Sequence, residues 1–324
     1  MAALHEAEWD AEESGQRSRP RAASGQLHSE QVYCSVIDAD KNGRTNLARS
    51  GLFYETMMTL WPLSRHLYRL SNQRGLRPLS KLLFRAIKSE AIIIPIHETI
   101  ANPESVVLPY PVLRPLIERA SARFLMNECM CRRGEGCQTY PQDLGCLYLG
   151  DGATKISPSM GRLVDSEEAV EHIGRAMALG LVPLVVHTSF DALALGIPYR
   201  RMLGICFCCD CCCTIQQGLR LGPPSFWDIV VRLPGLEVEV NGVCSGCGAC
   251  LEACYVKAIN LRDGRAHIDE ALCKGCGRCA TICPTGAISL RMDEDVDAMG
   301  QLVDRIARRT DIGMSNDRLT LEHG

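Results

Sequence analysis

The chain has 324 residues, 46% of them hydrophobic, and its 35 Lys and Arg residues nearly balance 38 Asp and Glu residues. This length and apolar content predict about two globular domains with real cores and exclude a wholly disordered protein. A net charge of −3 provides no basic excess for binding phosphates, so we expect no nucleic-acid partner. The longest apolar stretches fall far short of the ~20 residues of a membrane-spanning helix, so we also expect no membrane span.

Cysteine is the residue that departs most from an ordinary composition. The chain has 19 cysteines, and all but Cys34 lie between Cys129 and Cys283. Disulfide-rich domains are normally small and secreted, but residues 1–30 contain no apolar signal segment. We therefore expect a cytoplasmic protein, in which closely spaced thiols are more often metal ligands than disulfides. Residues 1–30 are predicted to be a disordered tail, either a functional arm or a leader without a role.

The first half of the chain alternates between helical and strand patterns. Apolar residues at helical spacing from about Leu52 to Ile87 predict a pair of helices, separated at Gly75 and Pro78. The β-branched run at 91–96 predicts a strand. Apolar positions from Val112 to Met126 predict a helix that leads into the first cysteines.

The clearest helix is predicted at 165–179. Asp165 and Glu168 resemble a capping box, and Gly180 is placed to end the helix. Apolar runs at 181–186 and 202–207 then predict two short buried strands, the second of which leads directly into a dense group of cysteines. The Gly-Pro-Pro sequence at 222–224 indicates a boundary.

These patterns predict an α+β protein with two domains. Residues 52–221 form a Cys-rich module of mixed α/β structure, and residues 230–292 form a second domain that opens with an alternating strand at 236–240. Residues 293–324 are predicted to be a helical tail. We expect its apolar face to pack on its own domain rather than on a partner protein.

The second domain contains an internal duplication. A shift of 29 residues places the first run (Cys244, Cys247, Cys250 and Cys254) on the second run (Cys273, Cys276, Cys279 and Cys283). Each run reads Cys-x₂-Cys-x₂-Cys-x₃-Cys. This is the spacing in which a tight Gly-containing loop directs three thiolates at one iron–sulfur cluster and a fourth thiolate at another.

In these motifs residues 236–292 resemble the bacterial-type ferredoxins that hold two [4Fe–4S] clusters. The resemblance implies a ferredoxin-like fold in which the fourth cysteine of each run ligates the other cluster. By this implication one cluster takes Cys244, Cys247, Cys250 and Cys283, and the other takes Cys273, Cys276, Cys279 and Cys254.

Local residues around the two runs agree with this chemistry. Four glycines allow positive φ and leave backbone N–H groups free to bind cluster sulfurs, namely Gly246, Gly248, Gly275 and Gly277. Asp263-Gly264 predicts a hairpin turn between short strands that contain Ile259 and Ile268.

One position departs from the ferredoxin pattern, and one alternative remains. Cys283 is followed by the expected Pro284, whereas Cys254 is followed by Tyr255, which removes no ligand but alters the packing around one cluster. The alternative is a pair of structural zinc sites, whose ligands often come as separated Cys-x₂-Cys pairs. Zinc gives no reason for the three-plus-one spacing.

Ten further cysteines lie in the N-terminal module. The first four are Cys129, Cys131, Cys137 and Cys146, which we predict to form an additional metal site, either iron–sulfur or zinc. Arg132 and Arg133 lie among them. We interpret these arginines either as cations that offset thiolate charge or as solvated loop residues.

The other six crowd into eight residues, as Cys206, Cys208, Cys209, Cys211, Cys212 and Cys213. In an extended segment Cys206 and Cys208 face one way, and Cys209, Cys211 and Cys213 face the other. This strip is therefore predicted either to divide its thiols between two sites or to join the Cys129 group. The Cys-x-Cys-Arg element, the Gly-Cys-Leu-x-Leu-Gly element and the Cys-Cys strip are similar to the Cys-rich part of ferredoxin-domain proteins from anaerobes, whose role is unassigned.

Other motifs carry no functional prediction. Gly150-x-Gly152 with Lys155 lacks both the third glycine of a dinucleotide fingerprint and the Gly-Lys-Ser/Thr of a P-loop. His97 and His187 each end an apolar run, where a structural histidine is the expected interpretation. No pattern for nucleophilic or acid–base catalysis is evident, so no catalytic residue is predicted.

Three functions are compatible with the sequence. The first is an electron-transfer protein or redox-enzyme subunit that passes single electrons through two [4Fe–4S] clusters to a redox partner protein or within a larger oxidoreductase complex. The second is a reductase whose N-terminal metal site is fed by the ferredoxin domain. The third is an iron–sulfur redox sensor, for which the acidic helix at 165–179 offers no DNA-binding face. We therefore expect a carrier or subunit rather than a free-standing enzyme.

Overall fold

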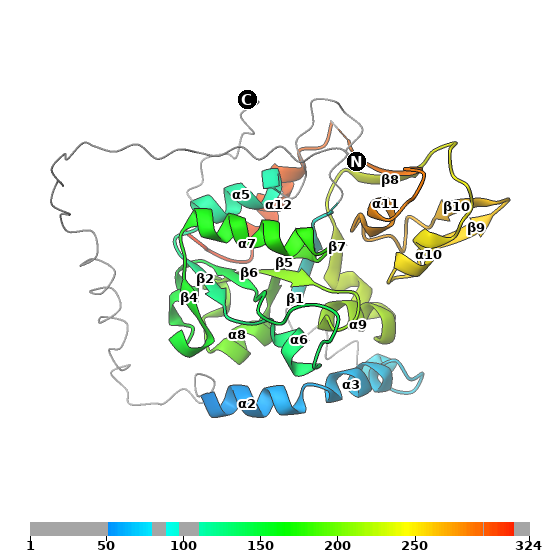
Figure 1. Ribbon diagram of the computed structural model, residues 1–324. Helices are drawn as coiled ribbons and strands as arrows, with labels where there is room; N and C mark the ends of the chain where they lie inside the picture. Colours follow the sequence, from blue (N-terminus) through cyan, green and yellow to red (C-terminus); the bar gives the residue numbers. More distant parts are fainter. Residues whose placement is uncertain (1–50, 80–88, 97–109, 294, 314–324) are drawn as a thin grey trace, which may run out of the picture. The chain divides into compact units, whose positions relative to one another are not determined.

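The computed structural model describes residues 51–79, 89–96, 110–293 and 295–313, all of which fall within the unit at 45–324 (Figure 1). The predicted tail at 1–30, the second helix predicted near Ile87, and His97 lie outside the described residues. Helices and strands both occur, in agreement with the predicted α+β class. None of the helices in the described part is long and apolar enough to cross a membrane.

A seven-stranded sheet organises the N-terminal half. Its strands are β1 (Ser89–Ile93), β2 (Arg123–Met126), β3 (Leu147–Leu149), β4 (Gly161–Leu163), β5 (Val182–Thr188), β6 (Leu203–Cys208) and β7 (Val230–Arg232). They lie in the order β4-β2-β3-β6-β5-β1-β7, and all neighbours are antiparallel except β1 and β7. Since β7 pairs with β1, residues 230–232 belong to this sheet rather than to the cysteine repeat.

Helices cover both faces of the sheet (Figure 1). The helices are α2 (Gly51–Leu60), α3 (Leu63–Ser71), α5 (Tyr110–Arg119), α6 (Met130–Gly134), α7 (Ser166–Ala178), α8 (Ser189–Leu195), α9 (Thr214–Leu221) and α12 (Ala298–Ala307). Side chains of α5, α7 and α12 contribute to one buried apolar cluster, and those of α2 and α8 contribute to a second. Every residue of β5 is buried, as expected for a strand with both of its faces covered.

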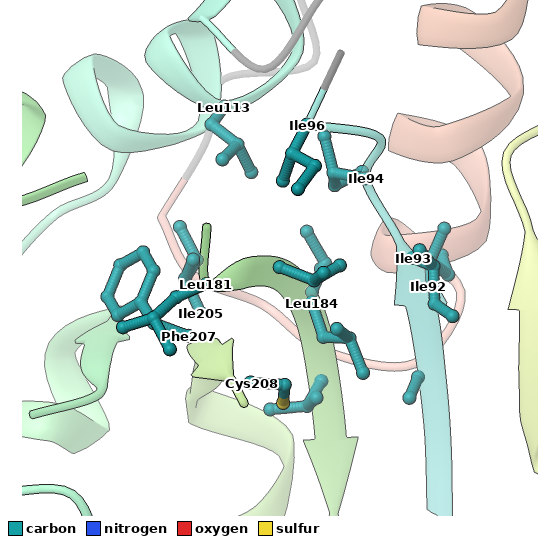
Figure 2. Close-up of a cluster of buried hydrophobic side chains, with 14 of the residues drawn as sticks. Ile92, Ile93, Ile94, Ile96, Leu113, Leu181, Leu184, Ile205, Phe207 and Cys208 are labelled. Atoms are coloured by element: carbon teal, nitrogen blue, oxygen red, sulfur yellow. The ribbon is translucent and has the colours of Figure 1, made fainter. Parts of the chain in front are cut away.

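The apolar core reaches directly to the cysteines. Figure 2 shows Leu184 and Ile205 from neighbouring strands packed with Phe207, and Cys208 at the end of β6 lies in the same cluster. The short buried strands predicted at 181–186 and 202–207 are confirmed as β5 and β6. The sheet therefore holds the start of the cysteine strip in a rigid, water-excluded position.

Two helix predictions need correction. The helical run is interrupted at Pro62 as well as around the predicted Gly75. Pro62 lacks the N–H that would continue α2 and stands at the N-cap of α3, and α3 ends at Ser71 before a turn at 72–76. The helix predicted from Val112 to Met126 ends at Arg119, and the chain continues as β2. The Arg123 side chain donates hydrogen bonds to the carbonyl oxygens of Ile117 and Glu118, which satisfies the last turn of α5.

The helix α7 begins and ends as predicted. Asp165 is its N-cap and accepts a hydrogen bond from the Glu168 backbone N–H at 2.8 Å, and Gly180 follows its C-cap with φ 73°. The reciprocal half of the capping box does not form, because the Glu168 carboxylate pairs with Arg162 instead.

We expect Asp165→Ala to lower the free energy of unfolding by about 1 kcal/mol, the usual effect of losing an N-cap side chain. Anaerobic denaturant unfolding followed by circular dichroism measures the change. Glu167→Ala, in the same first turn but not at the cap, is the matched control and should change stability by less than half as much. Equal losses in the two variants would contradict the role of the cap.

The repeat segment consists of one antiparallel strand pair formed by its two ends, one hairpin and two short helices. They are β8 (Leu236–Val240) paired with β11 (Ile288–Met292), β9 (Ile259–Arg262) paired with β10 (Arg265–Ile268), α10 (Ala249–Ala253) and α11 (Arg278–Thr281). Asp263 and Gly264 have φ of 50° and 71°, so the predicted hairpin turn is confirmed.

The predicted C-terminal helix is present as α12, but it is tied to the large sheet. Glu90 of β1, which is buried, forms ion pairs with Arg305 and Arg309. Just after the helix, the Thr310 hydroxyl donates a hydrogen bond to the Met202 carbonyl oxygen beside β6. The tail therefore reinforces the strands that position the N-terminal cysteines.

Candidate metal centres

The two cysteine loops of the repeat adopt the same backbone conformation. Gly246 and Gly248 have φ of 67° and 79°, and the equivalent Gly275 and Gly277 have φ of 68° and 81°. These left-handed conformations disfavour residues that carry a Cβ. The prediction that glycine shapes both loops is confirmed.

Backbone N–H groups point at the sulfurs of the fourth cysteines in equivalent ways. Ala258 donates to Cys254 Sγ at 3.2 Å, and Ala287 donates to Cys283 Sγ at 3.3 Å. Such donors favour the thiolate that a metal cluster requires. The two halves of the sequence repeat therefore share the same backbone hydrogen bond to their fourth cysteine.

The second run meets the last cysteine of the first run. Cys254, Cys273, Cys276 and Cys279 line one cavity beside Val238 and Tyr255. Burial raises the pKa of Cys276 to about 11, and the charges of Cys254 and Cys273 act in the same direction. These four thiols surround a common space, which is what the ligands of one cluster need.

The first run correspondingly meets the last cysteine of the second run. Burial raises the pKa of Cys250, and the nearby charges of Cys244, Cys247 and Cys283 raise it further. The eight thiols thus fall into two sets, each with three cysteines from one run and the fourth from the other. This is the division that the ferredoxin resemblance implies.

The N-terminal module brings four thiols into a compact group, which we call the four-thiol group. Its members are Cys137, Cys209, Cys211 and Cys212, whose sulfurs all lie within 4.8 Å of one another. The Cys137 and Cys211 sulfurs are 3.6 Å apart. The backbone N–H of Cys212 donates to Cys209 Sγ at 3.3 Å.

The remaining six thiols form a separate chain of neighbours, which we call the six-thiol group. In order of contact its members are Cys206, Cys146, Cys129, Cys131, Cys213 and Cys208. The sulfurs of Cys146 and Cys206 are 3.3 Å apart. All eighteen cysteines from Cys129 to Cys283 are free.

The sequence-predicted set of Cys129, Cys131, Cys137 and Cys146 is not brought together as one group. Cys137 lies in the four-thiol group, and the other three lie in the six-thiol group. The strip at 206–213 is not extended throughout, because β6 ends at Cys208 and the chain turns at 210–212 before α9. This turn separates Cys209, Cys211 and Cys212 from the thiols of β6.

Arg132 lies fully buried between the two groups, with 0% of its surface exposed. Its guanidinium donates hydrogen bonds to the carbonyl oxygens of Pro141 and Phe207, at 2.8 and 2.7 Å, and to that of Leu144. Burial alone would lower the pKa of Arg132, but the charges of Cys129, Cys146 and Cys209 outweigh burial and raise it.

Arg132 therefore fits the first interpretation of the sequence, a cation that offsets thiolate charge. The neighbouring groups that raise its pKa are all cysteine thiols. Arg133 fits neither interpretation, since it lies in helix α6 and its half-buried side chain forms ion pairs with Glu55 and Glu128. The two neighbouring arginines thus have different roles.

Two contacts join the repeat to the N-terminal thiols. Arg278, between two cysteines of the second run, pairs with Asp210 of the cysteine strip at 2.6 Å. The Ile96 backbone N–H, just beyond β1, donates to the Cys276 carbonyl oxygen at 3.1 Å. The repeat is therefore fixed against the sheet that carries the other cysteines.

Tyr255, the departure from the ferredoxin pattern, forms a third contact. The residue is only 5% exposed. Burial raises the pKa of its hydroxyl, and the charges of Cys276, Cys208 and Cys213 raise it further, so the ring faces cysteines of both regions. Its buried hydroxyl has no hydrogen-bond partner among the described residues.

The other motifs have structural roles. His187 stacks on Tyr199 at a centroid distance of 3.9 Å, and its Nε2 lies 2.7 Å from the Tyr199 carbonyl oxygen. Gly150 lies close to the Arg201 carbonyl oxygen, leaving little room for a side chain. Neither forms part of the candidate centres.

Comparison with known families gives one match. Residues 243–287 match the 4Fe-4S dicluster domain. No curated protein and no solved structure matches the chain. The C-terminal part thus contains an iron–sulfur, ferredoxin-type domain, and its chemistry is iron–sulfur electron transfer in general terms.

Proposed function

We propose that this protein passes single electrons through two [4Fe–4S] clusters, as a carrier or as a subunit of a larger oxidoreductase complex. Cys244, Cys247, Cys250 and Cys283 ligate the first cluster, and Cys273, Cys276, Cys279 and Cys254 ligate the second. The cavity lined by the second set and the equivalent N–H donors of the two loops support this assignment. When bound, each cluster supplies reversible one-electron chemistry.

The chain's own residues prepare these sites for a cluster. Left-handed glycines let the backbone curl around each site, and N–H groups satisfy the thiolate charge. Burial of Cys250 and of Tyr255 excludes water from one side of each set. Hydrogen bonds and burial are the two means by which a protein sets a cluster potential.

The observation that carries the proposal is the packing of the second set against the N-terminal cysteines through Tyr255 and Arg278. A free-standing ferredoxin would need no such attachment. We propose that the N-terminal module holds a further iron–sulfur or zinc site, so that the repeat exchanges electrons with that module or with a redox partner protein docked on it.

A reductase whose N-terminal site is fed by the repeat is the second candidate, and the same contact favours it. A cytoplasmic location belongs to the proposal, because eighteen free thiols persist best in a reducing compartment. A redox sensor is the weakest candidate, since helix α7 carries three glutamates and only one arginine.

The experiment that tests the proposal is an anaerobic redox titration of Tyr255→Phe followed by EPR. The Tyr255 hydroxyl has no partner among the described residues, and we propose that it would donate to a sulfur of the bound second cluster. Removing it should shift the midpoint potential of that cluster to a more negative value, because a hydrogen bond to a cluster sulfur raises its potential. The first cluster is the internal control and should keep its midpoint. Unchanged midpoints in both would contradict the role of Tyr255, and the absence of any reversible signal in the wild type would contradict electron transfer itself.

A further inference from the structure

We infer that Cys137, Cys209, Cys211 and Cys212 bind a single tetrahedral metal ion, zinc or iron, with no inorganic sulfide. This inference rests on the part of the proposed function that places a further metal in the N-terminal module. It assigns the ligands of that site and its nuclearity. It also separates these four residues from the six-thiol group.

The spacing of the sulfurs decides between one ion and a cluster. Four thiolates around one ion with metal–sulfur bonds of ~2.3 Å form a tetrahedron with edges of ~3.8 Å. The four sulfurs lie within 4.8 Å of one another, and the Cys137 and Cys211 sulfurs are 3.6 Å apart. In a [4Fe–4S] cluster each thiolate binds a different iron, so the sulfurs stand much farther apart.

The repeat provides the comparison within the same chain. Its eight thiols are all described, and no three of them come within the spacing of the four-thiol group. The six-thiol group likewise contains no three sulfurs this close together, although neighbouring pairs touch. Among the described cysteines, the compact tetrahedral arrangement therefore belongs to these four.

Backbone hydrogen bonds orient two of the four sulfurs, those of Cys137 and Cys209. The backbone N–H groups of Tyr140 and Thr139 donate to Cys137 Sγ, and that of Cys212 donates to Cys209 Sγ. These donors come from the turn after Cys137 and from the turn after β6. Two loops more than seventy residues apart in the sequence thus bring their thiols to one place, which is the usual arrangement of a structural metal site.

A buried cation partly offsets the charge of a metal–thiolate centre at these residues. A divalent ion with four thiolates carries a net charge of about −2. The fully buried Arg132 lies next to Cys209 and provides positive charge without contact with a carboxylate. Since four protein ligands leave no open coordination position, the metal has a structural role and links the Cys137 loop to the cysteine strip at 206–213.

The test is a count of zinc, iron and acid-labile sulfide in full-length protein purified without oxygen. Cys211→Ala should lose about one metal ion per chain and no sulfide, and the EPR signals of the two clusters should remain. Cys206→Ala, in the six-thiol group, is the matched control and should keep that ion. Cys211→His should restore binding, because imidazole can replace a thiolate as a ligand.

Three outcomes would overturn the inference. One is an unchanged metal content in Cys211→Ala. Another is the loss of iron together with sulfide, which indicates a cluster at these residues. The third is the loss of the same ion in Cys206→Ala. If Cys211→Ala does not fold, X-ray absorption of the wild-type zinc, or Mössbauer spectra of iron, must show one ion with four sulfurs at ~2.3 Å and no neighbouring metal. If the wild-type protein shows neither cluster signal, the proposed function is contradicted rather than this inference.

Discussion

Cys254→Ala should remove the cluster of the second run, although Cys254 belongs to the first. The reason is that its sulfur lines the same cavity as Cys273, Cys276 and Cys279. In the purified protein, the iron bound by the repeat should fall from about eight to about four atoms per chain. The acid-labile sulfide should fall by the same number. EPR of the reduced protein identifies which signal disappears.

Cys283→Ala is the matched control, because it occupies the equivalent position in the other run and has the equivalent hydrogen bond. It should remove the other signal and leave the one that Cys254→Ala removes. If each variant instead destroyed the cluster of its own run, the crossed assignment would be wrong.

The second large effect is expected at Arg132. Arg132→Met keeps most of the side-chain volume but removes a buried charge and the donors to three carbonyl oxygens. The thiols around it then lack their counter-charge. We expect the free energy of unfolding to fall by about 3–5 kcal/mol, the range for removing one partner of a buried charge interaction.

Arg133→Met is the control for this prediction. Arg133 follows directly in the sequence, but its ion pairs with Glu55 and Glu128 are partly solvated. Its replacement should lower stability by about 1 kcal/mol or less. Anaerobic guanidinium unfolding gives both values, and similar losses in the two variants would contradict the proposed role of buried charge.

Features encoded by neighbouring residues could be predicted from the sequence. The turn at Asp263 and the cap at Asp165 depend on residues within three positions of each other, and the structure confirms both. The break between α2 and α3 depends on Pro62, which the apolar periodicity does not indicate. The end of α5 depends on a cap from the side chain of Arg123, which lies beyond the helix, so the apolar pattern of the helix does not indicate it.

The grouping of the ten N-terminal cysteines could not be predicted in the same way. Cys137 and Cys211 meet because the loop after α6 and the turn after β6 are brought together by the fold, and no local spacing encodes that contact. The sequence did identify Tyr255 as unusual. Only the fold shows that this ring faces Cys208 of the N-terminal module.

The most direct test of the account is a combined iron, sulfide and electron count on full-length protein prepared without oxygen. We predict at least about eight irons and eight sulfides per chain and the reversible uptake of about two electrons by the repeat, one for each cluster. EPR should show two interacting centres. A well-folded protein that contains zinc in place of this iron, or one that takes up no electrons reversibly, would contradict the account.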